Sequence, residues 1–403
     1  MKVLQINAVN IIRSTGRTTK EIHDYLKKYG HESIVAYSEG PDCENTYKIG
    51  STIEKKIHGL LSRLLGLQGY FSKIGTKNLI NYIVQEKPDV VRLGNLHSDY
   101  INIPMVLKFL AKDDIPTVLT LDDCFFFTGK CCHYTADNCY KWKIGCKNCI
   151  RVHKDNNSWF LDRTKKMWKD KKNLYDNIPR LAVVGVSEWI TREAKESILS
   201  SAKYIKTIYN WIDTDLFKPI NTIELRKKLF LQNKFIILGV ASGWSNSKGL
   251  NYFIELSKCI DDNHSIILVG NIPKSIELPN NIIHIQETNN VQELVQYYSM
   301  ADVFLQLSLE ETFGKVTAEA LSCGTPVIVF DSTANPELVG YKCGYVANKS
   351  SLKDVVKYIE CIKFNTKEYY SNSCREFALN NFNKEDRISD YINLFENLIN
   401  VRE

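Results

Sequence analysis

The sequence predicts an α/β protein built from two doubly wound, Rossmann-like domains. The chain of 403 residues is long enough for two domains with separate hydrophobic cores. It opens with an expected strand at 3–7, a helix at 18–29 and a second strand at 33–37, which is how a doubly wound sheet begins. The same alternation starts again with a strand at 235–240. Residues 327–330 form an unbroken apolar run, as expected of a parallel strand buried on both faces.

The composition is that of an ordinary soluble globular protein, with 44% apolar and 24% charged residues. The formal net charge of +6 is too modest to indicate nucleic acid as a partner. The first eight residues are too few and too polar for a secretory signal, and no apolar run reaches the roughly 20 residues of a membrane helix. We therefore expect a cytoplasmic protein, free or bound to a membrane surface, whose twelve cysteines are mainly reduced.

One glycine, Gly16, lies in an expected loop at 14–17, between the first strand and the first helix. This is the carboxyl edge of the sheet, where ligands bind in doubly wound folds. The loop has no Gly-x-Gly-x-x-Gly pattern, so the dinucleotide fingerprint is absent. From the residues alone, a tight turn without a ligand is the better interpretation.

Residues 53–82 are expected to be helical and amphipathic, and Gly66 and Gly69 divide them into two helices. Core packing of the apolar face is the expected role, and contact of a basic amphipathic helix with anionic lipid is the alternative. The apolar positions at helical spacing are Ile57, Leu60, Leu61, Leu64 and Leu65. The polar positions off that face are Lys55, Lys56, His58 and Arg63.

Two polar side chains follow the strands expected at 88–93 and 116–121. His97 lies in the loop after the first of these strands, and Asp122 follows the second directly. Because the carboxyl ends of parallel strands share one edge of a sheet, both residues are candidates for contact with a ligand. A capped or core histidine is the alternative for His97.

The loop 124–149 holds six of the twelve cysteines. It ends in a Cys-x2-Cys pair at 146–149, and Cys139 together with Cys131 or Cys132 would complete the ligand set of a structural zinc ion. Thiolates are good zinc ligands, and a loop rich in Gly, Lys and Asn gains order from a metal. The spacing is not that of a common zinc module, so reduced thiols and a disulfide within the loop stay open as alternatives.

Residues 151–175 carry eight basic side chains against three acidic ones, a net charge of +5. Aromatic side chains, among them Trp159, Phe160 and Trp168, are interleaved with the charges. A solvated helix face and docking at an anionic membrane surface explain such a run equally well. No nucleic-acid-binding motif accompanies the charge.

Two glutamates, Glu311 and Glu319, flank a loop and the start of a short helix within the stretch 310–330. Gly314 between them lets a ligand approach the backbone closely, and the amides of residues 314–317 are available to an anion at the helix start. A sugar nucleotide fits this arrangement, with its diphosphate on the amides, its ribose on Glu319 and its transferred sugar near Glu311. An ordinary helix–strand unit with solvated glutamates is the alternative.

This stretch resembles the Glu-x7-Glu signature of family 4 retaining glycosyltransferases of the GT-B fold. The matching residues are Glu311, Phe313, Gly314, Glu319, Ala320, Cys323, Gly324, Thr325 and Pro326. Residues 210–219 resemble the family's Asn-x-x-Asp-x-x-x-Phe-x-Pro passage between domains. The resemblance implies two doubly wound domains that face a cleft. They are an acceptor-side domain at 1–205 and a nucleotide-sugar-binding domain at 206–385, and a final helix at 386–403 packs back on the first domain.

The cysteine-rich loop resembles a subgroup of this family that acts in bacterial capsule, exopolysaccharide, lipopolysaccharide and colanic acid synthesis. Its Thr-Gly-x-Cys, Cys-x-Lys-Trp and Gly-Cys-x2-Cys segments match residues 128–131, 139–142 and 145–149. The subgroup usually has a His, directed toward the sugar, where this chain has Asp122. Ser242 is the counterpart of an Arg that the family usually places on the diphosphate.

The resemblance assigns the chemistry to four residues. Lys248, just before a helix expected at 250–260, would hold the donor diphosphate, and Glu311 would position the transferred sugar. His97 and Asp122 would meet the reacting sugar. The other residues expected to bind the donor are Gly16, Ser242, Gly270, Thr288, Phe313, Gly314, Lys315, Val316 and Glu319.

The implied reaction is transfer of a hexose from a nucleotide sugar to a hydroxyl of a saccharide acceptor, with retention at the anomeric carbon. The acceptor is expected to be lipid-linked, which would bring the protein to the inner face of the cell membrane. Departure of the diphosphate would depend on Lys248 and helix-end amides, with no cofactor, no metal ligand and no divalent metal in the site. A nucleotide-sugar epimerase on the same fold and a non-catalytic sugar-binding partner of a polysaccharide assembly complex stay open as alternatives.

Overall fold

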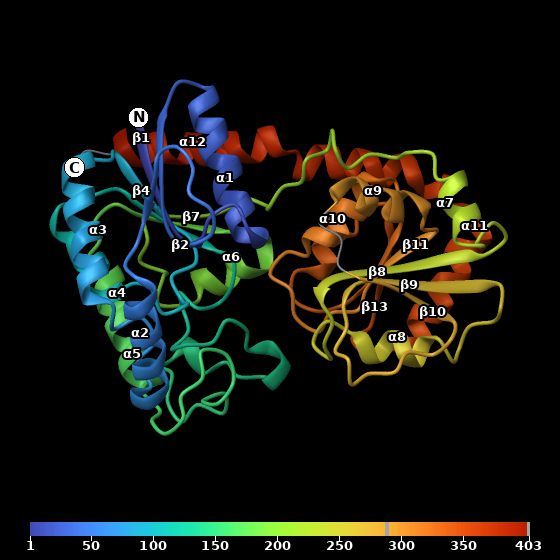
Figure 1. Ribbon diagram of the computed structural model, residues 1–403, viewed down its shortest axis with the longest axis horizontal. Helices are drawn as coiled ribbons and strands as arrows, with labels where there is room; N and C mark the ends of the chain where they lie inside the picture. The colour runs from blue at the N-terminus through green and yellow to red at the C-terminus, as the bar shows by residue number, and fades with distance from the viewer. Residues whose placement is uncertain (287–289, 401–403) are drawn as a thin grey trace. The chain divides into compact units, whose positions relative to one another are not determined.

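The computed structural model describes residues 1–286 and 290–400, and the chain folds into two compact units. The first unit comprises residues 1–208 together with the chain from Ile388 onward, and the second comprises Tyr209–Arg387. Each unit contains one parallel sheet with helices packed on it (Figure 1). The predicted α/β class with two Rossmann-like domains is confirmed.

The sheet of the first unit has the strand order β3-β2-β1-β4-β5-β6-β7, and all its neighbouring strands are parallel. The order reverses at β1, which creates the switch point where doubly wound folds bind their ligands. Every residue of β4, β5 and β6 is buried, as their apolar sequences require. The strands are β1 (Lys2–Val9), β2 (Glu32–Glu39), β3 (Thr46–Lys48), β4 (Val90–Leu93), β5 (Thr117–Leu121), β6 (Leu181–Gly185) and β7 (Tyr204–Thr207).

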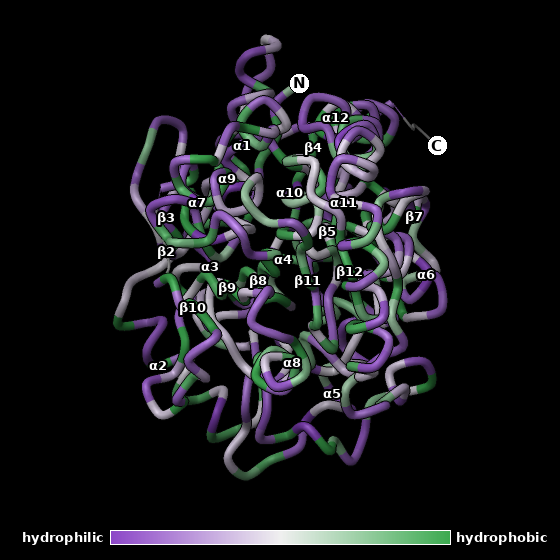
Figure 2. The backbone as a smooth tube through the Cα atoms, turned by 90° about the vertical axis from the view of Figure 1, so that its right-hand side faces the viewer, coloured by the Kyte–Doolittle hydropathy of each residue, from purple (hydrophilic) through white to green (hydrophobic). Residues whose placement is uncertain are grey.

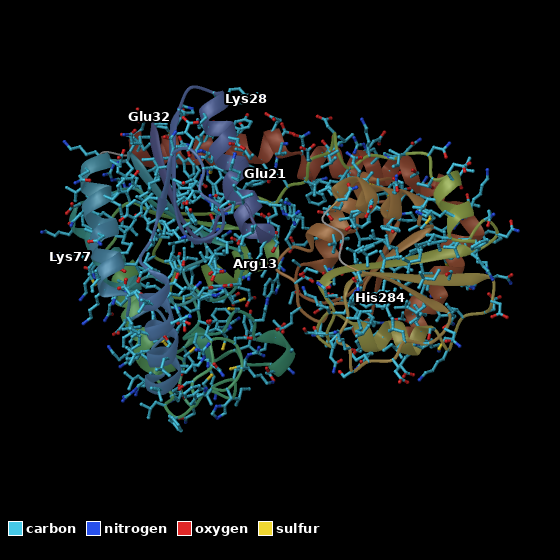
Figure 3. All side chains as sticks on the ribbon, in the orientation of Figure 1. Arg13, Glu21, Lys28, Glu32, Lys77 and His284 are labelled. Atoms are coloured by element: carbon cyan, nitrogen blue, oxygen red, sulfur yellow. The ribbon has the colours of Figure 1, made fainter. Side chains whose placement is uncertain are left out.

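Helices cover both faces of this sheet, with α1 on one side of the strands and α3 on the other in Figure 1. Charged side chains such as Lys28 on α1 and Lys77 on α3 project outward (Figure 3). The helices of this unit that precede the second unit are α1 (Arg13–Lys28), α2 (Thr52–Leu65), α3 (Lys73–Glu86), α4 (Ile103–Lys112), α5 (Thr164–Tyr175) and α6 (Glu188–Lys195).

The first helix begins earlier than expected, and this changes the place of Gly16. Residues 14–17 form the first turn of α1 instead of a loop. A Cβ atom on Gly16 would lie 3.1 Å from the backbone nitrogen of Ile11 and 3.2 Å from Cγ2 of Val9. Gly16 therefore lets the helix start close against the end of β1.

The last helix, α12 (Lys384–Asn400), is held on the first sheet by a buried cation. Arg92 on β4 is fully buried, and its Nε donates to Thr120 Oγ1 at 3.0 Å and its NH1 donates to Gln5 Oε1 at 3.3 Å. The ring of Tyr391 from α12 lies 5.4 Å from the guanidinium. Neutral oxygens and an aromatic ring thus satisfy this cation and connect α12 to β1, β4 and β5.

The sheet of the second unit has the order β10-β9-β8-β11-β12-β13 and is also parallel throughout. Hydrophobic segments gather in the strands, whereas the connecting loops are mainly hydrophilic (Figure 2). The strand expected at 327–330 has these bounds in the structure. The strands are β8 (Phe235–Gly243), β9 (His264–Asn271), β10 (Ile282–Ile285), β11 (Val303–Gln306), β12 (Val327–Phe330) and β13 (Gly344–Ala347).

The longest helix of the chain, α11 (Leu352–Phe382), was missed from the sequence. It is two helices joined at Thr366, whose φ of 64° and ψ of 160° are not helical. No helix in the described residues is both long and apolar enough to cross a membrane. The other helices of this unit are α7 (Ile223–Lys228), α8 (Leu250–Leu256), α9 (Val291–Met300) and α10 (Lys315–Ser322).

The orientation of α2 corrects the expectation that its apolar face packs in the core. Ile57, Leu60 and Leu65 of that face, and Ile53 before it, are 41% to 71% exposed, whereas Leu61 and Leu64 are half-buried. The exposed residues, which we call the α2 apolar face, are Ile53, Ile57, Leu60 and Leu65.

Small and polar residues occupy the buried side of α2, where His58, Gly59 and Ser62 meet the rest of the unit. His58 Nδ1 lies 2.7 Å from Ser72 Oγ, and burial lowers the pKa of His58 to about 4. Ser62 Oγ donates to Asp99 Oδ1 at 2.9 Å, and a Cβ on Gly59 would lie 3.2 Å from Asp99 Oδ2. Hydrogen bonds and close approach therefore fix this helix, which a hydrophobic pattern does not reveal.

Candidate active site

Two neighbouring parallel strands of the second unit bring Lys248 and Glu311 to one sheet edge. Lys248 follows β8, and Glu311 follows β11, which pairs with β8. Lys248 Nζ lies 2.6 Å from Glu311 Oε1, which also accepts a hydrogen bond from Gln306 Nε2 at 3.2 Å. The side chain of Lys248 is 41% exposed, whereas that of Glu311 is 14% exposed. The structure thus joins two of the predicted catalytic residues and leaves the ammonium group accessible.

Gly249 fixes the position of the loop that carries Lys248. Its φ of 85° is left-handed, and a Cβ at this position would lie 2.4 Å from the carbonyl oxygen of Leu307. Glycine is the residue that accepts both the conformation and the close approach. The loop after β8 is thereby held against the loop after β11, and this contact sets the distance between Lys248 and Glu311.

The start of α10 forms a polar recess around Gly314, which has a φ of 90° and precedes the first helical residue. The site of a Cβ on Gly314 would lie 3.5 Å from Thr317 Oγ1 and 3.7 Å from both Asn335 Oδ1 and Gln306 Nε2. In the described part of the chain, Thr317 Oγ1 and Asn335 Oδ1 are buried without a hydrogen-bond partner. A buried polar atom without a partner costs about 1–3 kcal/mol, so a ligand hydroxyl or phosphate oxygen here would be stabilised.

Sequence reasoning missed Gln306, Thr317 and Asn335. They come from the end of β11, the first turn of α10 and the short helix η3 (Asn335–Leu338), and they meet only in the folded unit. The one signal that the sequence carries is Thr317, a polar residue in the first turn after the Gly-containing loop.

Glu319 and Phe313 are predicted donor-binding residues, but both are buried and packed within the second unit. Glu319 is buried on α10, and its Oε2 accepts a hydrogen bond from the buried hydroxyl of Tyr298 at 2.8 Å. The ring of Phe313 packs against Phe382 and Tyr209, with ring centres 5.3 Å and 6.1 Å away. Lys315 and Val316 are half-buried in the first turn of α10.

Gly270 and Ser242 lie at the ends of two neighbouring strands, β9 and β8. A Cβ on Gly270 would lie 1.6 Å from the carbonyl oxygen of Ala241, so no other residue fits without moving the backbone. The carbonyl of Gly270 is hydrogen-bonded to Nε2 of His284, a β10 residue labelled in Figure 3, at 2.8 Å. Ser242 is exposed. The remaining predicted donor residue, Thr288, lies outside the described residues.

In the first unit, the partner of His97 is Asp123, which sequence reasoning missed. His97 Nε2 lies 2.8 Å from Asp123 Oδ2, and Asp123 Oδ1 accepts a hydrogen bond from the backbone N–H of Phe125 at 2.8 Å. The predicted residue Asp122 lines the same small pocket as His97, Asp123 and Thr120. The adjacent carboxylates therefore have different roles, because Asp123 holds the imidazole while Asp122 stays on the pocket wall.

The charge of Asp123 is stabilised by its surroundings. Burial alone would raise the pKa of Asp123, but the positive charge of His97, the hydrogen bond between them and the N–H of Phe125 outweigh it. The pKa of Asp123 is consequently lower than its ordinary value. A carboxylate that stays ionised can orient the imidazole of His97 through their hydrogen bond.

One group of three metal-type ligand atoms lies within 4.8 Å in the residues that the structure describes. It consists of His97, Asp123 and Cys132. Because His97 and Asp123 already share a hydrogen bond, the group is satisfied as it stands.

Part of the second unit matches a known family. Residues 221–378 match the family described as "Glycosyl transferases group 1". An uncharacterized 41.2 kDa protein from the cps region of Klebsiella pneumoniae is 26% identical over 251 residues, which are 59% of this chain and 68% of that protein. The putative colanic acid biosynthesis glycosyl transferase WcaC of Escherichia coli is 23% identical over 330 residues, 77% of each chain.

Solved structures with low sequence identity share the fold. Sucrose-phosphate synthase from Thermosynechococcus elongatus has a TM-score of 0.72 and 13% identity, and the match covers 98% of both chains. HepE from Anabaena, solved in complex with UDP, has a TM-score of 0.68 and 16% identity over 98% of this chain and 100% of that one. Both resemble this chain over its whole described length.

Proposed function

We propose that this chain is a GT-B glycosyltransferase and that it transfers a hexose from a nucleotide sugar to a hydroxyl of a saccharide acceptor. The match of residues 221–378 to the group 1 glycosyltransferases supports this proposal. Transfer with retention of the anomeric configuration follows from the Glu-x7-Glu resemblance. Homologues named for the cps region and for colanic acid synthesis favour cell-surface polysaccharide synthesis as the pathway. The observation that carries the proposal is the ion pair of Lys248 and Glu311 beside the recess at Gly314.

The donor would occupy the edge of the second sheet. Because Lys248 is accessible, the diphosphate would replace Glu311 as the ion-pair partner of its ammonium group. The diphosphate oxygens would occupy the recess at Gly314, where the amides at the start of α10 attract anions. Glu311, released from the lysine, would accept hydrogen bonds from hydroxyls of the transferred sugar. HepE, a structure of the same fold, is solved with UDP, which supports a nucleoside diphosphate as the ligand class.

The reaction needs charge stabilisation more than it needs a nucleophile on the protein. The bond between the anomeric carbon and the diphosphate oxygen breaks, and a bond from the acceptor oxygen to the same carbon forms. The electron pair of the broken bond stays on the diphosphate, where Lys248 and the amides of α10 stabilise it. The proton of the acceptor hydroxyl leaves to the diphosphate or to His97, so neither a divalent metal nor another cofactor is needed for the balance.

The acceptor would bind to the first unit. His97, oriented by Asp123, and Asp122 line one pocket whose polar wall suits sugar hydroxyls. A galactosyltransferase from Escherichia coli that is 27% identical over 219 residues acts on a GlcNAc-diphosphoundecaprenol, which supports a lipid-linked saccharide as the acceptor here. The chain spans 55% of that protein, so the acceptor class is an inference of this proposal.

A turnover screen of the purified chain tests the proposed function. Incubation with a panel of UDP-, GDP- and ADP-sugars, with and without saccharide or polyprenyl-diphosphate acceptors, should release a nucleoside diphosphate from at least one donor and do so faster with acceptor. Product release without any acceptor and with inversion of one sugar hydroxyl would indicate an epimerase. No release and no thermal stabilisation with any donor would contradict the proposal in favour of a non-catalytic partner.

We further propose that the first unit docks on the anionic inner face of the membrane through the α2 apolar face. Trp159 and Phe160, 45% and 74% exposed, continue this face, because the N–H of Trp159 donates to the carbonyl of Arg63 at 2.7 Å near the end of α2. Exposed basic residues beside them, such as Lys56 and Lys165, would meet lipid phosphates while the apolar side chains insert. Such docking would place the protein where a lipid-linked acceptor lies.

Vesicle sedimentation tests this docking. Wild-type protein should pellet with vesicles of phosphatidylglycerol and phosphatidylcholine, and less with phosphatidylcholine alone or in high salt. The double variant Ile53→Glu and Ile57→Glu should bind about tenfold or more weakly, because about 25 cal/mol per Å² of apolar burial is lost. Phe230→Asp, which changes an exposed aromatic residue of the second unit, is the control. Equal binding of the double variant and the wild type to anionic vesicles would contradict this proposal.

A further inference from the structure

The segment between β5 and α5 in the first unit is long and has little regular structure. Residues 122–163 contain, as described helical elements, the short 3-10 turns η1 (Thr135–Asp137) and η2 (Lys141–Lys143). Irregular segments of this length are uncommon in compact domains and need a source of order besides a hydrogen-bonded backbone. The contacts of its cysteines show what that source is.

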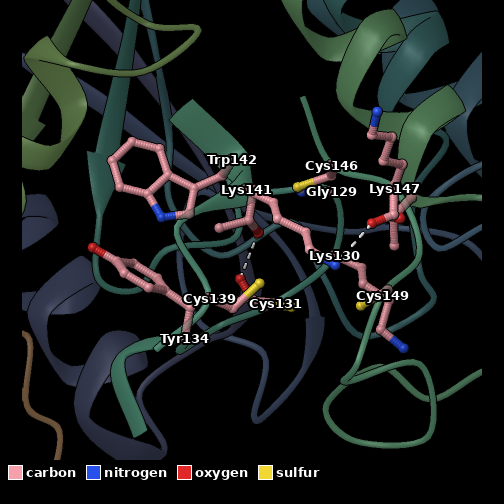
Figure 4. Close-up of a pocket in the computed structure, with 12 residues that line it drawn as sticks. Gly129, Lys130, Cys131, Tyr134, Cys139, Lys141, Trp142, Cys146, Lys147 and Cys149 are labelled. Atoms are coloured by element: carbon pink, nitrogen blue, oxygen red, sulfur yellow. Dashed lines mark hydrogen bonds between the residues drawn. The ribbon is translucent and has the colours of Figure 1, made fainter. Parts of the chain in front are cut away.

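Four of the six cysteines in this segment line one pocket of about 330 Å³, and Figure 4 shows them around it. Cys132 is not among the residues of this pocket, since its sulfur lies with His97 and Asp123 instead. The structure therefore separates the two adjacent cysteines that the sequence could not distinguish. The cysteines of the pocket are Cys131, Cys139, Cys146 and Cys149.

The sulfur atoms of this pocket are held by neighbours that suit thiolate ligands. The thiols of Cys131 and Cys149 are within hydrogen-bonding distance of each other. The backbone N–H of Gly129 donates to Cys146 Sγ at 3.2 Å, and a Cβ on Gly129 would lie 3.0 Å from the Cβ of Cys146. Hydrogen bonds to ligand atoms are what orients them in metal sites. Trp142 lines the same pocket, and its buried Nε1 has no hydrogen-bond partner among the described residues.

Two buried lysines supply positive charge beside the pocket. Lys130 donates to the carbonyl of Val152 at 2.6 Å, and Lys171 donates to the carbonyl of Phe125 at 2.5 Å. Both side chains are buried, and neither forms an ion pair with a carboxylate in the described part of the chain. Buried cations are costly unless negative charge lies near them. Cysteines of this segment act on both lysines, together with Asp155 and Asp162 at Lys130 and Asp123 at Lys171. Four thiolates and one divalent cation carry a net charge of −2, which these two ammonium groups offset.

We propose that the four cysteines of this pocket bind one zinc ion, which holds the segment in its folded form. Zinc prefers tetrahedral thiolate sites, and such closed sites contribute to folding instead of catalysis. The ion would connect the Cys-x2-Cys turn at 146–149 to Cys131, which follows the pocket of His97 and Asp123 by a few residues. It would take no part in sugar transfer, so the proposal is independent of the proposed function.

Zinc would draw the pocket together. Among the described residues, no three of the four sulfur atoms lie within 4.8 Å of one another. Zinc–sulfur bonds of about 2.3 Å would set the sulfur atoms at roughly 3.8 Å from each other. The contact between Cys131 and Cys149 already approaches this arrangement, and Cys146 and Cys139 would move inward into the open volume.

Metal analysis of the full chain tests the proposal directly. Protein purified without chelator should contain close to one zinc per chain by inductively coupled plasma mass spectrometry, and the zinc should survive dialysis. Cobalt exchanged into the protein should show the visible d–d bands and the near-ultraviolet charge-transfer band of a tetrahedral thiolate site. Zinc near zero together with no thiolate–cobalt spectrum would overturn the proposal, as would a disulfide in this segment found by mass spectrometry of non-reduced peptides.

Two variants locate the ion. The double variant Cys146→Ser and Cys149→Ser should lose at least tenfold in bound zinc, whereas Cys259→Ser, which changes an exposed cysteine of the second unit, should keep its zinc. If the double variant does not fold, the cobalt spectrum of the wild-type protein still shows whether thiolates are the metal ligands. Full zinc content in a folded double variant would place the ion elsewhere and contradict the proposal.

Discussion

Replacement of Lys248 by alanine is expected to lower kcat for sugar transfer by about 100- to 1,000-fold. The ammonium group is the accessible cation beside the recess at Gly314, and it would stabilise charge that develops on the departing diphosphate. Removal of one such preorganised group from an active site typically has an effect of this size. Initial rates at saturating donor, followed by release of nucleoside diphosphate, measure the change.

Three further variants separate this role from a structural one. Lys258 is an exposed lysine of the same unit, and it forms an ion pair with Glu255 at 2.8 Å, much as Lys248 does with Glu311 at 2.6 Å. Lys258→Ala should therefore leave the rate of sugar transfer unchanged. Lys248→Arg should recover part of the rate, since it keeps the charge. Glu311→Gln should lower kcat more than it raises the donor KM. Unchanged turnover in Lys248→Ala, with a normal melting temperature, would show that the diphosphate is held elsewhere.

The fold class was predictable because the alternation of strands and helices is local and repeated. The strand at Ile282–Ile285 follows directly from an apolar run between turn residues. The helix α2 shows where this reasoning ends. Its apolar face predicted burial, yet hydrogen bonds of His58 and Ser62 and the close approach of Gly59 turned the other face inward. A hydrophobic pattern shows that a helix is amphipathic. It does not show which of its two faces packs against the rest of the domain, because polar neighbours can bury the polar face.

The sequence predicted the proximity of Lys248 and Glu311 but not the polar recess beside them, and both outcomes have a related reason. Lys248 and Glu311 were found because each stands in a recognisable motif, and parallel topology then brings them together. The sequence could not predict the polar recess, because Thr317 and Asn335 are brought together only by packing around Gly314 in the folded unit. The sequence does not distinguish Asp123 from Asp122, so Asp123 was not predicted. The turn after β5 determines that the carboxylate of Asp123 faces His97.

The pair of His97 and Asp123 leads to the second large expected effect. His97→Ala should lower kcat by about 100-fold, because a side chain that exchanges a proton with a reacting hydroxyl typically contributes at least this much. Asp123→Asn should lower kcat by a smaller factor, because the imidazole of His97 remains but loses the carboxylate that orients it. His31→Ala, which changes a half-buried histidine at the amino end of β2, is the control.

Stability measured against pH gives an independent test of the same pair. Because the pKa of Asp123 is lower in the folded protein than its ordinary value, the ionised carboxylate stabilises the fold above the unfolded-state pKa near 3.8. This contribution is lost as the pH falls through the lower, folded-state pKa. Asp123→Asn should therefore reduce the free energy of unfolding of the first unit by about 1.5–3 kcal/mol at pH 7, the typical value of a hydrogen bond to a charged group, and by less in acid. Urea titrations at pH 7 and at about pH 2.5, below the unfolded-state pKa, would contradict the assignment if wild type and variant differed equally at both, because a purely steric effect does not titrate.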